Sequence, residues 1–447
     1  MNSLAKFGPE LRRRRLAAGM TLDGLAARVH YSKGQLSKVE TGRQQPTPEL
    51  ARLCDGAVGA AGELAALVPY GPGVPRPSRR LVMAAGAGAA LALGGPPSGA
   101  AEPVPPAGAA GAGGGMTPAS PARAVGAADP AGMADAVGGP LLDGVQALFG
   151  EFRRLGQTAP AAFVLPSLAA QARALPSLAR ASGGRTARGL YVLASRYAEF
   201  TGWMAQESGD DGAALTWTDA AVRLAEAAGD RDLAAYALVR RGLIAFYSGD
   251  AKATVELVQG AQAGRLPARV RGLAAQREAQ GHALGGDRDS CLRALDRARG
   301  LLDRAATAGA DGLPVVGTTH VGDPVSMTTG WCLLDLGLPR QAAEALDREV
   351  ALLPEHALRT RVRYGVRRAL SHAVAGEVEH ACAIALPLLA GGEALASATI
   401  RVDLQRLSRV LARHHRNPAV RALSPLLTAA LHGTVHPTVV REAVPRV

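Results

Sequence analysis

A dense run of polar side chains lies near the N-terminus, in the stretch YSKGQLSKVETG at residues 31–42. Ammonium and guanidinium groups can pair with guanine edges or with phosphate, an amide can pair with adenine, and a hydroxyl suits either kind of partner. Groups of these types stand at Ser32, Lys33, Gln35, Ser37, Lys38 and Arg43. The same residues would also suit the water-facing side of an ordinary helix, so the flanking sequence has to decide between the two interpretations.

Residues that could support catalysis or metal binding are scattered. The histidine pair in RHHRNP at 413–418 has neither HExxH nor CxxC spacing, and the sequence contains no P-loop and no GxSxG motif. The four cysteines stand apart in apolar helical patterns, which favours small buried hydrophobes in a reducing cytosol: Cys54, Cys291, Cys332 and Cys382. We therefore expect neither an enzyme nor a metal or cofactor.

The composition bounds the class of protein. A chain of 447 residues is too long for one small core, so we expect two or more domains. Aromatic residues make up only 4%, and strand-like alternation is rare, which predicts an all-α protein. The net charge of +12 suits a polyanionic partner.

Helix start and stop signals divide the first 70 residues into five short helices. We expect them at 7–19, 21–30, 32–42, 47–59 and 62–68. Thr21 and Ser32 are placed to cap the second and third helices, while Gly19 and Gly42 are placed to end the first and third. Apolar spacing predicts one small core from Leu11, Leu16, Leu25, Val29, Leu36, Val39, Leu50 and Leu53.

The segment 11–54, LRRRRLAAGMTLDGLAARVHYSKGQLSKVETGRQQPTPELARLC, resembles the lambda-repressor-like helix-turn-helix family of the Cro/XRE type. The shared pattern includes Gly-Met-Thr, Leu-Ser-x-Val-Glu-x-Gly and Leu-x-x-Leu, and the resemblance spans about 60 residues. It implies a five-helix DNA-binding domain at 5–69, whose helix after Ser32 enters the major groove. Leu22 is a departure, because the family usually has a glutamine there that clamps a phosphate.

The resemblance also assigns roles to individual residues. In a helix laid nose-first into the groove, first-turn side chains point at base edges while free backbone N–H groups face phosphate. Lys33 then suits guanine, and Gln35 suits adenine. The complete predicted DNA-binding set is Thr21, Ser32, Lys33, Gln35, Ser37, Lys38 and Arg43, of which the last three contact the backbone.

The pattern does not by itself fix the roles of the remaining polar residues of this domain. Glu40 is expected to be structural. Tyr31 and His30 either pack or contact DNA. Three arginines either contact phosphate or face solvent: Arg12, Arg14 and Arg15.

The tract 71–140 is rich in Ala, Gly and Pro, and it predicts a disordered linker. Its stretch SRRLVMAAGAGAALALGG at 78–95 looks like a twin-arginine export signal, but it follows a folded domain. The apolar run is about 14 residues, short of the roughly 20 that span a bilayer. We therefore expect no membrane role and a cytoplasmic, nucleoid-associated protein.

Residues 141–432 return to amphipathic helix and repeat a turn. The turns begin at 209, 249, 286, 337 and 376, with intervals of 40, 37, 51 and 39 residues. Each begins with Gly, suited to end one helix, and three continue with Asp, suited to cap the next. Five residues after each Gly stands a small side chain that lets helices cross closely: Ala214, Thr254, Cys291, Ala342 and Ala381.

This pattern resembles tetratricopeptide repeats, although the periods are longer than the nominal 34 residues. The insertion at 309–324 is expected to be a loop, and 394–413 with 418–432 are expected to form a last, capping pair. A generic helical bundle is the alternative to a repeat domain.

The layout is similar to that of actinobacterial-type regulators, in which a helical-repeat sensor follows the DNA-binding domain. Some Gram-positive relatives bind peptide pheromones, commonly through Asn side chains, yet residues 141–416 contain no Asn. A peptide, a small molecule, a protein partner or oligomerisation alone therefore remain open. Candidate groove residues, which are otherwise solvated or in salt bridges between repeats, are Arg196, Trp203, Arg240, Gln276, Gln280, Arg363 and Arg367.

These observations predict a sequence-specific transcriptional regulator that binds double-stranded DNA as a homodimer. The alternative is a repeat scaffold for a protein partner, with secondary DNA binding. A flexible linker of about 70 residues spans roughly 42–50 Å, enough to join half-sites about 34–36 Å apart. Because such a tether cannot transmit a rigid twist, we expect regulation through dimerisation.

Overall fold

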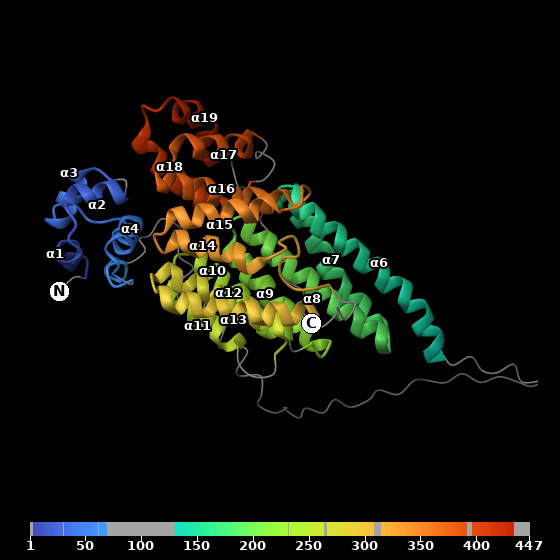
Figure 1. Ribbon diagram of the computed structural model, residues 1–447. Coiled ribbons are helices and arrows are strands. Elements are labelled where there is room, and N and C mark those ends of the chain that lie inside the picture. Colours follow the sequence, from blue (N-terminus) through green and yellow to red (C-terminus); the bar gives the residue numbers. More distant parts are fainter. Residues whose placement is uncertain are drawn as a thin grey trace, which may run out of the picture.

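The computed structural model describes residues 3–29, 31–60, 62–68, 130–230, 232–262, 266–307, 314–390 and 396–432. Every regular element in these ranges is a helix, which confirms the all-α prediction. A small N-terminal domain lies beside a larger helical-repeat region (Figure 1). Most of the predicted linker, including the export-like stretch, lies outside the described residues. The repeat region begins earlier than predicted, with α6 (Pro130–Thr158).

The N-terminal domain contains α1 (Ser3–Ala17), α2 (Leu22–Val29), α3 (Lys33–Glu40) and α4 (Pro48–Val58). The predicted fifth helix is only a 3-10 turn, Ala65–Leu67. The predicted core is formed except for Leu16, which is 59% exposed. Leu16 lies five residues after Leu11 and so points away from its face, whereas Phe7, four residues before Leu11, fills the core instead.

Side-chain caps fix the ends of these short helices. Thr47 accepts a hydrogen bond from the Leu50 N–H at 3.1 Å and begins α4, and Gly59, with φ of 65°, ends it. The Asp55 carboxylate then accepts three backbone N–H groups of the following turn, from Gly62, Leu64 and Ala65. The domain is therefore closed by local hydrogen bonds as well as by its core.

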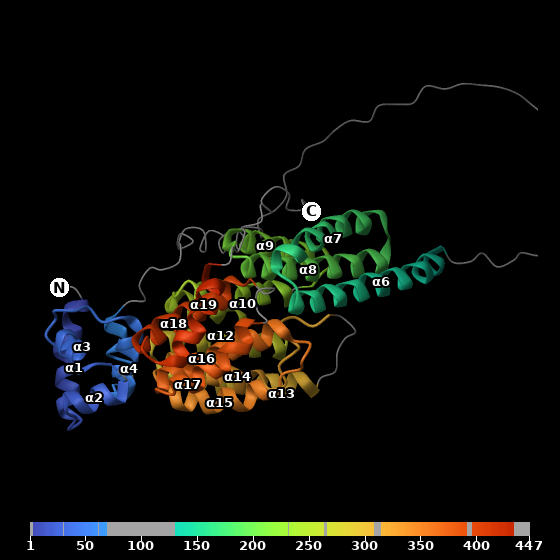
Figure 2. The same ribbon diagram turned by 90° about the horizontal axis from the view of Figure 1, so that it is seen from above.

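The repeat region is a succession of antiparallel helix pairs (Figure 2). After α6 come α7 (Ala161–Ala181), α8 (Gly184–Glu207), α9 (Asp211–Ala227), α10 (Asp232–Tyr247), α11 (Ala251–Gln259), α12 (Ala268–Gly285) and α13 (Arg288–Thr307). The C-terminal half consists of α14 (Pro324–Asp335), α15 (Pro339–Ala351), α16 (Leu358–Ala375), α17 (Val378–Ala390), α18 (Ala398–Leu411) and α19 (Pro418–His432). Among the described helices, none combines the length and apolar character that a bilayer crossing requires.

The five predicted turns join the two helices of successive pairs. Their glycines all have positive φ, between 75° at Gly249 and 94° at Gly376. The five small residues that follow are fully buried where helices cross: Ala214, Thr254, Cys291, Ala342 and Ala381. The last pair, α18 and α19, and a loop at 314–323 also match the prediction.

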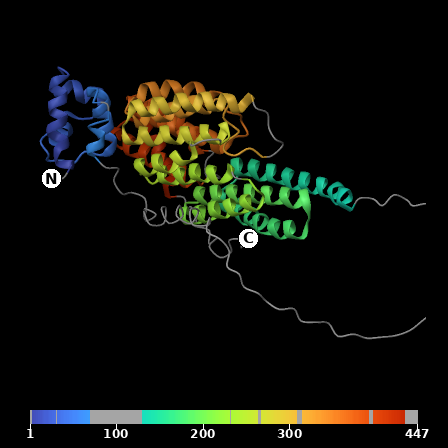
Figure 3. The same cartoon turned by 90° about the horizontal axis from the view of Figure 1, so that it is seen from below.

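The N-terminal domain packs directly against turns of the repeat region, and all three views show it there (Figure 3). Gly62 lies against Gly286 in the α12–α13 turn, and Gly56 lies against Gly337 in the α14–α15 turn, so closely that added Cβ atoms would meet backbone oxygens. Arg413, just after α18, stacks over the Tyr31 ring at 3.9 Å. The two parts of the chain are thus joined by a surface contact in addition to the linker.

Candidate functional site

The turn between α2 and α3 presents the N-terminus of α3. Thr21 Oγ1 accepts from the Gly24 N–H at 3.0 Å and caps α2 as predicted. Ser32 and Gln35 form a reciprocal capping box, in which Ser32 Oγ accepts from the Gln35 N–H at 3.2 Å and Gln35 Oε1 accepts from the Ser32 N–H at 3.4 Å. Gln35 thus caps its own helix through its amide oxygen, and the adenine contact predicted for this residue stays a prediction.

The polar side chains predicted to contact DNA are accessible. Lys33, Ser37 and Lys38 are exposed on α3, while Leu36 and Val39 on the opposite face are buried in the core. Arg43 is exposed just beyond the end of α3. The helix thus offers one polar face to a partner and anchors the other in the domain.

Lys33 has a partner in the free protein. Its Nζ lies 2.7 Å from Asp23 Oδ2 on α2, and the two side chains are 62% and 68% exposed. An ion pair this exposed contributes about 0–1 kcal/mol, so exchange of Asp23 for guanine or phosphate costs little. Asp23 also places a negative charge beside the face predicted to meet DNA.

A buried ion pair holds α3 against α1. Arg15 Nε and Nη2 donate to the two Glu40 oxygens at 2.7 and 2.9 Å, and the side chains are 8% and 6% exposed. This bidentate pair agrees with the structural role expected for Glu40. It corrects the phosphate role considered for Arg15, which faces inward, whereas Arg12 is exposed.

The remaining arginine of this group and the turn residues also have partners. Arg14 donates to Glu10 at 2.6 Å and also contacts Glu63. Tyr31 is buried and packs against Arg413, which favours the packing interpretation. His30 lies outside the described residues.

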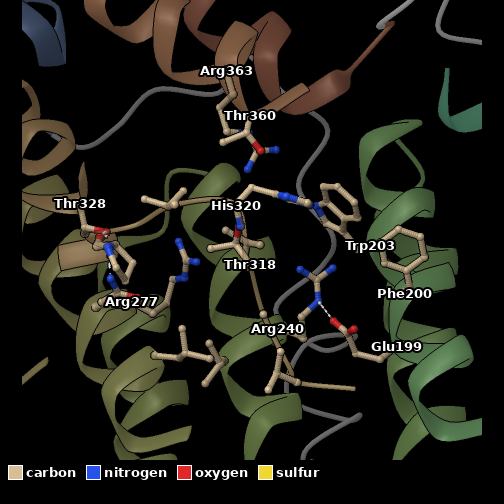
Figure 4. A pocket seen from close by; sticks show the side chains of 18 of the residues that line it. Glu199, Phe200, Trp203, Arg240, Arg277, Thr318, His320, Thr328, Thr360 and Arg363 are labelled. Atoms are coloured by element: carbon tan, nitrogen blue, oxygen red, sulfur yellow. Dashed lines mark hydrogen bonds and ion pairs between the residues drawn. The ribbon is translucent and has the colours of Figure 1, made fainter. Parts of the chain in front are cut away.

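A central pocket of about 190 Å³ lies within the repeat region (Figure 4). It is lined by α6, α8, α10, α12, α14, α16 and the loop 314–323. Six of the seven predicted groove residues line it: Arg196, Trp203, Arg240, Gln276, Gln280 and Arg363.

Arg367 is the exception, and its predicted place in the groove is wrong. It lies one helical turn beyond Arg363, where it is 1% exposed between α14 and α18 and forms ion pairs with Asp335 and Asp403. Its guanidinium also stacks over the Trp331 ring at 4.3 Å. Arg367 therefore joins repeats and does not face the pocket.

Other lining residues were missed by sequence reasoning. Arg153 comes from α6, before the first recognised turn, and Arg359 lies in the first turn of α16. Arg277 lies on α12 directly beside the predicted Gln276, so a search of both neighbouring positions on each inner helix would have found it. The loop 314–323 crosses the pocket, where Arg153 and Arg269 donate to its carbonyl oxygens.

A second cluster of polar side chains joins α15, α16 and α17. Ligand atoms of Asp347, His372 and His380 lie within 4.8 Å of one another, close enough to meet at a metal ion. Glu377 lies 2.6 Å from His372 Nδ1, and Arg368 contacts Asp347. Because a guanidinium already balances the carboxylate, the arrangement is that of a charged hydrogen-bond network.

A family model described as a helix-turn-helix domain matches residues 6–68. No curated protein and no solved structure matches the chain. The matched range extends from α1 to the 3-10 turn at Ala65–Leu67 and includes the capped α3. The N-terminal domain is thus a helix-turn-helix domain, the class that binds DNA.

Proposed function

We propose that the chain is a sequence-specific transcriptional regulator of the Cro/XRE type, which binds duplex DNA through α3. The exposed row on this helix carries the proposal: Lys33, Ser37 and Lys38 project outward from a helix with a capped N-terminus. Lys33 contacts a guanine edge, and Ser37, Lys38 and Arg43 contact the backbone. The protein then acts in the cytoplasm, on the nucleoid.

The helical repeats, which we assign to the tetratricopeptide type, form the sensor of this regulator. The pocket supports a sensor because aromatic and charged side chains from six helices converge on it. The covering loop and the modest volume favour a small ligand over an extended peptide or a protein partner. This observation ranks the sensor above the alternative of a protein-interaction scaffold.

We further propose that the regulator binds DNA as a homodimer. Two helix-turn-helix domains on half-sites about 34–36 Å apart give each operator two copies of α3. The contact of α4 and the Gly62 turn with the repeat region supplies a route from sensor to DNA-binding domain that does not depend on the linker. The proposed control through dimerisation can act together with this contact.

Genome-wide footprinting of the full-length protein tests the function. The expected result is protection of a limited set of related sites, and in Lys33→Ala a relaxed selectivity at the base pair that Lys33 contacts. Lys252→Ala removes another exposed lysine, from α11 and far along the chain from α3, and is expected to leave the footprint unchanged. Equal protection of all sequences by the wild type and Lys33→Ala would contradict the assignment.

A further inference from the structure

The central pocket carries more positive charge than the described side chains around it neutralise. Six arginines line it: Arg153, Arg196, Arg240, Arg277, Arg359 and Arg363. Arg196 pairs with Asp230 at 2.9 Å, and Arg240 lies 3.3 Å from Glu199. These two arginines are each matched by one carboxylate.

Of the other four arginines, only two contact a carboxylate among the described residues, and they contact the same one. Glu207, which is fully buried, contacts both Arg359 and Arg363. Burial alone would raise the pKa of Glu207, but the two guanidinium groups lower it overall and keep it charged. One negative charge thus serves two positive ones.

Arg153 and Arg277 have only neutral partners among the described residues. Arg153 donates to the carbonyl oxygens of Val315 and Gly317 at 3.1 and 2.9 Å. Arg277 donates to the Gln280 side chain, and its buried Nε has no hydrogen-bond partner. Burial lowers the pKa of Arg277 to about 10, so the group remains charged at neutral pH.

An unmatched charge held away from water opposes folding unless something neutralises it. Figure 4 shows Arg240 and Arg277 on opposite sides of the pocket with their head groups directed into it, and Arg363 beyond them. Several guanidinium groups that converge on one small space match the geometry of a bidentate anion. An anionic ligand in this space would neutralise the charge that the described side chains leave unmatched.

The other lining residues indicate which chemical groups the rest of such a ligand would carry. Aromatic rings surround the arginines: Phe149, Phe200, Trp203, Tyr236, Tyr247, Trp331 and Tyr364. Gln276 and Thr328, which are hydrogen-bonded to each other at 3.3 Å, and Thr360 offer a few polar groups. Such a lining suits a compact molecule with an apolar ring.

We infer that the central pocket binds a small organic anion, a carboxylate or phosphate ester on an apolar ring, with the anionic group against Arg277. This inference deepens the proposed sensor role and rests on it. The loop 314–323, whose carbonyl groups accept from Arg153 and Arg269, lines the same space. The anion neutralises the charge that the described side chains leave unmatched.

Thermal unfolding of the full-length protein tests the inference with three probes of similar shape. 3-Phenylpropionate and phenyl phosphate carry the anion, and 3-phenylpropan-1-ol carries none. We expect the two anions to raise the unfolding midpoint and to change the fluorescence of Trp203 and Trp331, and we expect the alcohol to do neither. The larger of the two anion effects identifies the anionic group.

Variants of Arg277 make the test independent of the probe. Arg277→Met should unfold at the same temperature as the wild type or higher without ligand, and should bind the anions about tenfold or more weakly. Arg277→Lys should keep part of the response, and Arg293→Gln, an exposed position on α13, should keep all of it. Equal stabilisation by the alcohol, no response to either anion, or a large loss of ligand-free stability in Arg277→Met would overturn the inference.

DNA binding is measured separately on the same preparations. Ligand binding without any sequence-specific DNA binding would remove the proposed regulator and leave the pocket intact. Sequence-specific DNA binding without an anion response would remove the pocket inference alone. The two proposals can therefore fail independently.

Discussion

The N-terminal domain and the central pocket use arginine in opposite ways. In the domain, Arg15 is buried against Glu40, and the bidentate pair joins α1 to α3. In the pocket, Arg277 is surrounded by rings and amides, and none of the described carboxylates pairs with it. A matched arginine belongs to the fold, whereas an unmatched one in a cavity points to a ligand.

The largest expected effect comes from replacing Arg15, which leaves its carboxylate partner unpaired. Arg15→Met leaves the Glu40 carboxylate buried without its partner, which costs about 3–5 kcal/mol. We expect the N-terminal domain to lose its cooperative unfolding transition and its DNA binding. Denaturant unfolding of the full chain, followed by near-UV circular dichroism and DNA binding, measures both.

The double variant Arg15→Met/Glu40→Leu is the control for this prediction. It removes both charges and is expected to recover most of the stability lost in the single variant. A single variant as stable as the wild type would show that the pair does not hold α3.

The next largest effect concerns base recognition by Lys33. Lys33→Ala is expected to reduce discrimination at one base pair by about 1–3 kcal/mol, while binding to unrelated DNA changes little. Competition titrations with operators substituted at each position measure this loss. If discrimination falls equally at every position, Lys33 contacts the backbone instead of a base.

The carboxylate of Asp211 tests the same idea, the cost of a buried unpaired charge, with a negative group. Burial, followed by the nearby Asp210, raises the pKa of Asp211 at the start of α9 to about 6, above its ordinary value of 3.8. The folded state therefore holds the proton more tightly, and stability falls as pH rises from about 4 through 6. Asp211→Asn should stabilise the chain by on the order of 2 kcal/mol above pH 6 and by nothing below pH 4.

Unfolding midpoints of the wild type and Asp211→Asn across this pH range provide the measurement. Asp219→Asn is the control. The Asp219 carboxylate pairs with Arg241, so this substitution should destabilise the folded chain. An equal gain for Asp211→Asn at all pH values would contradict the electrostatic explanation.

A smaller effect is expected at Arg43, which is exposed beyond α3. Arg43→Ala should weaken binding to all sequences alike and reduce the log–log salt slope by about one unit. Titrations at several salt concentrations test this. An unchanged slope would place Arg43 away from phosphate.

The smallest effect is a gain of affinity. Asp23→Asn releases Lys33 and removes a negative charge next to DNA, so affinity should rise by less than about 1 kcal/mol. The gain should shrink at high salt, where exposed charges are screened. Weaker binding in this variant would mean that Asp23 positions Lys33.

The features that could be predicted from the sequence are those that depend on residues close together along the chain. The capping residues, the five glycine turns and the buried small side chains follow from rules that span a few residues, and the structure confirms them. Six groove residues were also found, because they repeat on the first helix of successive pairs.

Contacts between residues that are far apart along the chain could not be predicted from such local patterns. Arg363 and Arg367 are one turn apart and chemically identical, yet only the contacts of α14 and α18 show that Arg367 is structural. Likewise, Arg15 pairs with Glu40 across the domain, and the packing of Gly62 on Gly286 joins segments more than 200 residues apart. These relationships depend on the folded chain and not on any motif.

The salt dependence of operator binding by the full-length protein tests the central claim most directly. If α3 enters the groove with Lys33, Lys38 and Arg43 at the duplex, the logarithm of affinity falls linearly with the logarithm of salt concentration, and a selected operator keeps its advantage over random DNA. Binding that is insensitive to salt, or no preference for any sequence, would contradict a DNA-reading role for this helix.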